Sequence, residues 1–287
     1  MPETLRDLAR STFLRLPASM RQAVLHARGR FAPWEDGFDF TPPVPGPGEV
    51  AGPPDFVGIG AQKAGTTWWF GLIASHPEVA HRADIHKERH FFDRFATNSF
   101  GPEDCAQYHG WFPRRAGTVT GEWTPDYLHL GWVPPLLMET APRAQLLVLL
   151  RDPVERFGSG LAHHRGHRGA LTAEVYADAL VRGFYGQALE EWRRHYPPEQ
   201  ILVLQYERCV QDPWGELERT YQFLGLPPFR PDAVTEHVNK KRTEVALPDD
   251  ACRRLREVYA PDVMKLVEST PDVEPSLWPN FSRLVRA

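Results

Sequence analysis

The sequence predicts an α/β fold: a single P-loop-like domain with a central parallel sheet flanked by helices, preceded by a Pro-rich N-terminal arm. Short, wholly apolar runs such as 146–150 alternate with longer helical patterns, as is typical of parallel strands buried on both faces. The first such run, 56–59, enters a Gly/Ala loop that opens a helix. With 287 residues and an apolar fraction of 42%, the chain fits one large α/β domain or two small ones.

The first 54 residues are predicted to lie outside the compact domain. Residues 1–31 place apolar side chains among scattered charges, which favours one or two amphipathic helices. Residues 31–54 are dense in Pro and Gly, and this composition excludes regular structure. We therefore expect an N-terminal helical segment and Pro/Gly-rich arm over 1–54 and one domain over 55–287.

Within the domain, predicted strands and helices alternate. Their expected order is strand 56–59, helix 66–75, helix 103–111, strand 118–122, helix 134–141, strand 145–150, a helix opened by Pro153, helix 172–195, strand 201–205, helix 214–224 and helix 249–259. Ligands of such sheets collect at the carboxyl ends of the strands. Residues that directly follow a predicted strand are therefore the first candidates for a site.

Composition and charge exclude several classes of protein. A formal net charge of −4 argues against general nucleic-acid binding, which needs a basic surface. The three cysteines lie far apart, as is typical of reduced thiols and of neither a disulfide framework nor a zinc site. No run approaches the roughly 20 apolar residues of a membrane-spanning helix, so no transmembrane segment is expected.

The loop after the first strand is predicted to hold a phosphate-like anion. A strand, a small-residue loop and a helix N-terminus aim backbone N–H groups and the helix dipole at one point. In the frame G-x-x-x-x-G-K-[ST], Gly60 and Gly65 fit, but Thr66 stands at the Lys position and the loop's Lys is Lys63. The loop therefore does not bind its anion in the way that serves Mg-ATP.

A second anion site is predicted at the end of strand 145–150. Arg151 follows this strand directly, and its guanidinium matches a phosphate in two places. Ser159, two turns into the next helix, could add a hydroxyl to the same phosphate. The alternative is an ion pair between Arg151 and Asp152 or Glu155, with Ser159 merely exposed.

Together, these two segments resemble the sulfotransferase family, whose members use 3′-phosphoadenosine 5′-phosphosulfate. Residues 62–68 are similar to its 5′-phosphosulfate motif, and 150–159 to its 3′-phosphate motif. Between them, 86–93 resembles the K-E-x-H-F-F-D segment of the carbohydrate (heparan-sulfate-like) branch, and 121–127 its G-E-K-[ST]-P-x-Y segment. The resemblance covers roughly 56–226 and implies a short, soluble, bacterial-type member.

The resemblance implies a donor site. The residues that it places around the 5′-phosphosulfate are Gln62, Lys63, Ala64, Gly65, Thr66, Thr67 and Trp68. It places Arg151 and Ser159 at the 3′-phosphate. It also places a basic loop that includes Lys241 and Arg242 over the nucleotide, with an ordinary solvated loop as the alternative. No metal is implied, since no companion acid stands where a Mg²⁺ ligand would.

The resemblance also implies catalytic roles. Lys63 would stabilise the leaving 5′-phosphate, and Glu88 would be the general base. Partial burial is expected to raise the pKa of Glu88 toward neutrality. His90 is the rival base, or else orients Glu88 or contacts the substrate. The alternative for both residues is an ordinary charged turn.

The acceptor is where this chain departs from the resembled pattern. Trp123 stands where the branch has a Lys, which favours a less anionic acceptor, unless Trp123 is an ordinary core residue. Tyr185 and Gln187 are further candidates for acceptor contacts, with helix packing as the alternative. The expected partner is a hydroxyl of a sugar or of a small or medium-sized natural product, in the cytoplasm.

Two other functions stay open at this stage. A P-loop small-molecule kinase would share the strand, loop and helix but would need a Lys directly before Thr67. A non-catalytic nucleotide-binding module would keep the fold without turnover. The presence of Lys63, Glu88, Arg151 and Ser159 argues against such a module.

Overall fold

The structure is a computed structural model that describes residues 20, 41–82, 86–168, 171–231 and 246–284. The predicted N-terminal helices and the basic loop with Lys241 and Arg242 lie outside these residues. The described end of the arm, from 41, has no helix and meets the domain through main-chain hydrogen bonds between Val50 and Arg114 at 2.9 and 3.1 Å.

Four parallel strands form the sheet of the described chain and confirm the predicted α/β class. They are β1 (Phe56–Gly60), β2 (Gly121–Trp123), β3 (Gln145–Leu150) and β4 (Ile201–Gln205), in the order β2-β1-β3-β4. All pairings are parallel, so the carboxyl ends of the four strands meet at one edge. β1, β4 and nearly all of β3 lie in the core because helices cover the sheet.

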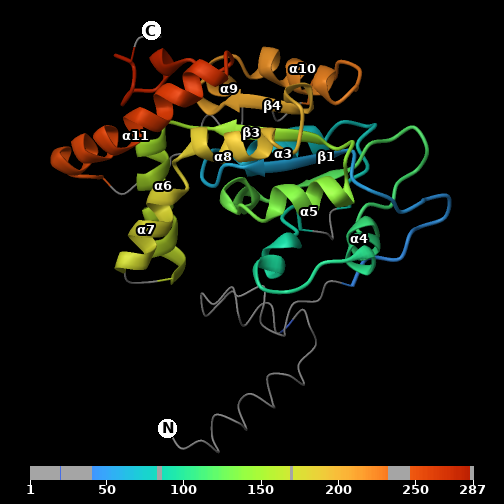
Figure 1. Ribbon diagram of the computed structural model, residues 1–287. Coiled ribbons are helices and arrows are strands. Elements are labelled where there is room, and N and C mark those ends of the chain that lie inside the picture. Colours follow the sequence, from blue (N-terminus) through green and yellow to red (C-terminus); the bar gives the residue numbers. More distant parts are fainter. Residues whose placement is uncertain (1–19, 21–40, 83–85, 169–170, 232–245, 285–287) are drawn as a thin grey trace, which may run out of the picture.

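Helices pack around this sheet. They are α3 (Thr66–Ala74), α4 (Pro102–His109), α5 (Val133–Thr140), α6 (Pro153–Arg168), α7 (Ala173–Val181), α8 (Tyr185–Arg193), α9 (Tyr206–Gln211), α10 (Pro213–Phe223) and α11 (Asp249–Ser269). Figure 1 shows α9 and α10 beside β4, and α5 toward the opposite edge of the sheet. Short 3₁₀ turns, such as Pro125–His129 after β2, complete the connections.

The predicted single helix 172–195 is wrong: the chain breaks between α7 and α8. A Cβ at Gly183 would lie 2.6 Å from the ring of Tyr259, so the turn between α7 and α8 closely approaches α11. The contact is between segments far apart in the sequence, and helical periodicity carries no information about it.

The last predicted helix is longer than expected. It was predicted to end at 259, but α11 continues through Pro261 to Ser269. Asp262, directly after this proline, accepts main-chain hydrogen bonds from Gly186 and Gln187 at 2.8 and 2.9 Å. These bonds and the buried residues that follow hold α11 against α8 and outweigh the helix-breaking tendency of Pro261. Among the described helices, none is long and apolar enough to cross a membrane.

Candidate active site

The loop between β1 and α3 has the geometry of an anion cradle. Lys63 and Gly65 have positive φ angles of 66° and 95°, and the loop delivers the chain into Thr66 at the start of α3. Its N-cap residue, Gly65, has no side chain that could cap the helix, and no acid lies in the first turn, so the first N–H groups of α3 point toward the loop. The uncapped N-terminus beside Lys63 fits an anionic ligand.

Lys63 lies close enough to Glu88, Lys87 and Arg151 for their charges to shift its pKa. Partial burial lowers the pKa of Lys63, Glu88 opposes this shift, and Lys87 and Arg151 add to it. The structure therefore brings the loop lysine, the predicted base and the arginine after β3 to the same carboxyl edge of the sheet.

Arg151 is almost fully buried and already has a carboxylate partner. Its Nη2 donates to Glu155 Oε2 at 2.8 Å, so the ion pair considered as the alternative is present. Its guanidinium also lies over the ring of Tyr206, 5.6 Å from the centroid. Ser159 follows Glu155 by four residues on α6, so both lie on one helix face beside the end of β3.

The C-terminal segment fixes the turn after Arg151, which sequence analysis did not predict. The main-chain N–H and the amide of Asn280 donate to Asp152 at 2.9 to 3.2 Å. Glu207 accepts from the main chain of Asp152 at 3.0 Å and from Trp278 Nε1 at 2.9 Å. These bonds hold the turn rigidly from a segment more than 120 residues away.

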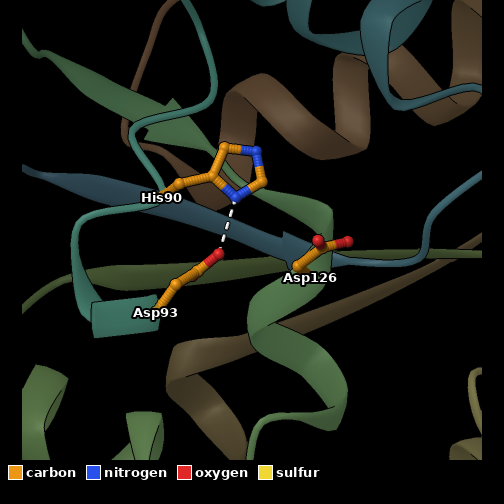
Figure 2. Close-up of side chains that lie close together, drawn as sticks. All are labelled: His90, Asp93 and Asp126. Carbon is orange, nitrogen blue, oxygen red and sulfur yellow. Dashed lines mark hydrogen bonds and ion pairs between the residues drawn. The ribbon is translucent and has the colours of Figure 1, made fainter. Parts of the chain in front are cut away.

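Glu88 and His90 lie together on the segment that follows residue 85. His90 Nε2 is 3.3 Å from Glu88 Oε2, and His90 Nδ1 is 2.8 Å from Asp93 Oδ2. Figure 2 shows the imidazole joined to Asp93, with Asp126 beside the pair. His90 has a φ of 50°, a conformation that a non-glycine residue adopts at a cost and that often marks a functional site.

The predicted direction of the Glu88 pKa shift is wrong. Burial raises the pKa of Glu88, but hydrogen bonds from His90 and Lys87 and their charges outweigh it and lower this pKa to about 2. For His90, burial lowers the pKa, but Asp93 and Glu88 raise it to about 10. At neutral pH the pair is therefore a carboxylate and an imidazolium.

The segment that carries Glu88 and His90 is held by the end of β2. Arg89 N donates to Thr124 Oγ1 at 2.8 Å and to Glu122 Oε2 at 3.1 Å. Phe91 N donates to the hydroxyl of Tyr127 at 2.9 Å. Glu122 has no exposed surface, so the segment depends on a buried carboxylate.

Glu122→Ala should destabilise the fold strongly. Besides Arg89 N, the carboxylate accepts from Tyr108 Oη at 2.6 Å and Thr124 Oγ1 at 2.5 Å, and truncation would strand these buried donors. We expect a loss of about 3 kcal/mol or more in the free energy of unfolding, measured by denaturant titration. Glu139→Ala, at an exposed position of α5, is the matched control. Equal stability of the two variants would contradict this role.

His90, Asp93 and Asp126 have the residue types of a metal site, but their partners do not suit a metal ion. One ligand atom from each lies within 4.8 Å of the others. However, Asp126 accepts from Arg182 Nη1 at 2.5 Å, and the two ring nitrogens of His90 lie 2.8 and 3.3 Å from carboxylate oxygens of Asp93 and Glu88. A metal ion would have to displace these partners. The cluster is instead a charged hydrogen-bond network behind Glu88.

Two of the predicted acceptor contacts are contradicted. Trp123 is 0% exposed and donates from Nε1 to Gly60 O at 3.1 Å, so it is a core residue. Tyr185 is also 0% exposed, and its hydroxyl donates to the carbonyl of Arg151 at 3.0 Å. Both side chains pack under the site and leave no surface for an acceptor. Gln187 is exposed on α8 and stays a prediction.

The family assignment follows from comparison with known proteins. The profile described as the sulfotransferase domain matches residues 53–246, more than half of the 287-residue chain. The chain belongs to the sulfotransferase family. The profile spans the loop lysine, the Glu88 segment and the Arg151 turn, which confirms the resemblance predicted from these motifs.

The curated relatives of this chain include heparan sulfate sulfotransferases. Heparan sulfate glucosamine 3-O-sulfotransferase 3B1 of Homo sapiens is 29% identical, covering 76% of this chain and 63% of that protein. Heparan sulfate glucosamine 3-O-sulfotransferase 6 of Mus musculus is 33% identical, covering 64% of this chain and 56% of that protein. The chain thus spans less than two thirds of the length of these relatives.

The sulfotransferase fold is also found in a solved structure. A sulfotransferase from Alicyclobacillus acidocaldarius superposes with a TM-score of 0.63 at 21% identity, covering 78% of this chain and 98% of that chain. This likeness confirms the fold, namely a parallel sheet flanked by helices.

Proposed function

We propose that the protein transfers a sulfuryl group from 3′-phosphoadenosine 5′-phosphosulfate to a hydroxyl of a sugar or small natural product, with Glu88 as general base. The observation that carries this proposal is the convergence of Lys63, Glu88 and Arg151 at the carboxyl edge of the sheet. A cationic loop, a carboxylate and a buried arginine are the three parts that this reaction needs.

The donor would be held at both anion sites. The uncapped start of α3 and Lys63 would bind the 5′-phosphosulfate, and Arg151 and Ser159 the 3′-phosphate. Because Glu155 now pairs with Arg151, a bound phosphate would share or replace this carboxylate. Lys63 would neutralise the charge that develops on the leaving 5′-phosphate.

In the transfer step the acceptor oxygen bonds to sulfur while the bond from sulfur to the 5′-phosphate oxygen breaks. The acceptor proton goes to Glu88, and 3′,5′-adenosine bisphosphate leaves. A pKa of about 2 makes Glu88 a weak base, but a loose transition state needs little proton transfer before the bond breaks. The protonation of His90 supports Glu88 as the base and gives His90 the role of holding the carboxylate.

A cleft beside the loop supports a neutral acceptor. It is a small pocket, lined mainly by apolar side chains together with Gln62, His129 and Arg182. Burial and Arg182 lower the pKa of His129 to about 4, so it is neutral at pH 7. The charge of Arg182 is matched by Asp126 and Asp178. Sugars, which the curated relatives' names indicate for those proteins, suit such a lining.

Donor-dependent sulfation tests the proposal directly. The protein is incubated with the phosphosulfate donor and a panel of sugars, glycosides and phenols, and products are read by a mass gain of one sulfuryl group. A thermal shift with Mg-ATP but not with 3′,5′-adenosine bisphosphate would favour the kinase. Tight bisphosphate binding without transfer to any acceptor would favour the non-catalytic module. The cytoplasmic location is a separate prediction, tested by fractionation.

Arg151→Ala should mainly weaken donor binding. A lost charge-assisted contact to phosphate corresponds to about 1.5–3 kcal/mol, or roughly a tenfold to hundredfold rise in the Kd of 3′,5′-adenosine bisphosphate. Calorimetric titration measures this change. Arg194→Ala, at an exposed arginine at the end of α8, serves as the control. Unchanged affinity in Arg151→Ala would remove Arg151 from the donor site.

A further inference from the structure

Lys87 makes a contact that the proposed reaction does not yet use. Its Nζ donates to Oε1 of Glu88 at 2.5 Å and to the main-chain carbonyl of Trp123 at 3.3 Å. Its side chain is 10% exposed, so the ammonium is largely shielded from water. Lysine is almost never buried unless it is paired. Here its partners are the proposed base and the end of β2.

Position 123 explains why the cation comes from Lys87. The resembled segment has a Lys there, but the ring of Trp123 points into the core, where a Cβ at Gly58 would lie 2.0 Å from it. What position 123 offers to the site is its carbonyl oxygen, and that oxygen accepts from Lys87. The positive charge beside Glu88 therefore comes from the neighbouring residue instead of from β2.

Glu88 is held from two sides. Lys87 binds Oε1, and His90 Nε2 lies 3.3 Å from Oε2, so each carboxylate oxygen has its own cationic donor. Two charge-assisted hydrogen bonds to different oxygens fix both the place and the rotation of a carboxylate. If Lys87 were neutral, Glu88 would be free to turn toward the remaining cations, His90 and Lys63.

We propose that Lys87 is a positioning residue of the transfer reaction, which holds the Glu88 carboxylate at the carboxyl edge of the sheet and supplies the cation that position 123 lacks. This inference rests on the proposed function, in which Glu88 accepts the proton. The charged groups around the ammonium are Glu88, Glu122, Asp126 and Lys63. Burial lowers the pKa of Lys87, and the three acids oppose that shift.

Turnover tests this role through a pair of variants. Lys87→Met keeps the length of the side chain and removes its charge, and we expect kcat to fall about tenfold to a hundredfold because the base is misplaced. The Kd of 3′,5′-adenosine bisphosphate should stay nearly unchanged, and Lys87→Arg should recover part of kcat. In a Glu88→Gln background, Lys87→Met should cost little more, since the two residues act as a unit. Lys265→Met, exposed on α11, is the matched control.

A second measurement needs no turnover. Carbon-13 NMR of the Glu88 carboxyl, assigned with Glu88→Gln, should show an ionised group at pH 4 in the natural protein, whose Glu88 pKa is about 2. Loss of the adjacent opposite charge should raise this pKa by about one unit or more in Lys87→Met, which shows as a higher midpoint when the carboxyl signal is titrated below pH 4. An unchanged carboxyl signal, or an unchanged kcat in an active protein, overturns the inference. If the natural protein transfers no sulfuryl group, the proposed function fails and the NMR comparison alone decides for Lys87.

Discussion

Glu88→Gln should reduce kcat by about 10² to 10⁴, the range that a positioned general base contributes. The amide keeps the shape of the side chain and can still accept from Lys87, but it cannot take the acceptor proton. Because Glu88 lies beside the donor loop and is not one of its anion-binding groups, the Kd of 3′,5′-adenosine bisphosphate should stay nearly unchanged. Steady-state turnover and calorimetry on the same preparation measure the two quantities.

This experiment needs a check of the folded state. In the native protein Glu88 balances Lys87 and His90, so the neutral amide leaves two largely buried cations with less compensation. The pKa of Glu88 is lowered, so its contribution to stability is present above pH 4.5 and is lost as the pH falls through about 2. Glu88→Gln should therefore be assayed near pH 7 and below its melting temperature, with Glu139→Gln as control. Full turnover in a folded Glu88→Gln would exclude Glu88 as the base.

Lys63→Ala should lower kcat by about 10² to 10³, which corresponds to roughly 2.7–4 kcal/mol of lost transition-state stabilisation. The ammonium would act where charge develops on the leaving phosphate, so its loss affects the reaction more than the ground state. Alanine keeps a Cβ at the φ of 66°, so the change does not relax the loop as a glycine would.

The split between kcat and donor affinity is the decisive readout for Lys63. Lys63→Ala should change kcat far more than the Kd of 3′,5′-adenosine bisphosphate, and Lys63→Arg should restore part of the rate. Lys265→Ala tests for an unspecific effect of removing a lysine. A folded Lys63→Ala with natural kcat would show that the loop binds the donor without assisting the reaction.

The sheet and the anion loops were predictable because their signals are local. The strand 145–150 was predicted with both ends correct, since an apolar run that ends in Arg-Asp-Pro has clear limits. β2 was placed too early, at 118–122, because Val119 is strand-like but pairs with Val79 outside the sheet. The short α9 was not predicted, because it follows β4 without a linker and has only six residues.

The site was predictable as a set of residues but not as a network. The motifs identified Glu88 and His90, but the order of the residues does not show that Lys87 and His90 both contact the Glu88 carboxylate. These contacts reverse the predicted pKa shift of Glu88, because its burial was predicted and its two cationic partners were not. The anchoring of Asp152 by Asn280 spans 128 positions, and local patterns cannot predict it.

The same limit explains why two of the acceptor contacts were predicted wrongly. Trp123 and Tyr185 belong to segments that resemble the carbohydrate branch, but the side-chain direction is set by packing against Gly58 and by the hydrogen bond to Arg151. Alternation along a strand as short as β2 does not show which face carries the ring. Of the acceptor contacts predicted from the sequence, Gln187 is the one left to test.

The most direct test of the account follows both products of one reaction. The protein, the phosphosulfate donor and the acceptor panel are analysed by mass spectrometry for sulfated acceptor and for 3′,5′-adenosine bisphosphate. We predict that the two products appear in equal amounts with the natural protein and that both nearly vanish with Glu88→Gln. A natural protein that binds the bisphosphate and sulfates no acceptor, or that transfers phosphoryl from Mg-ATP, would contradict the account.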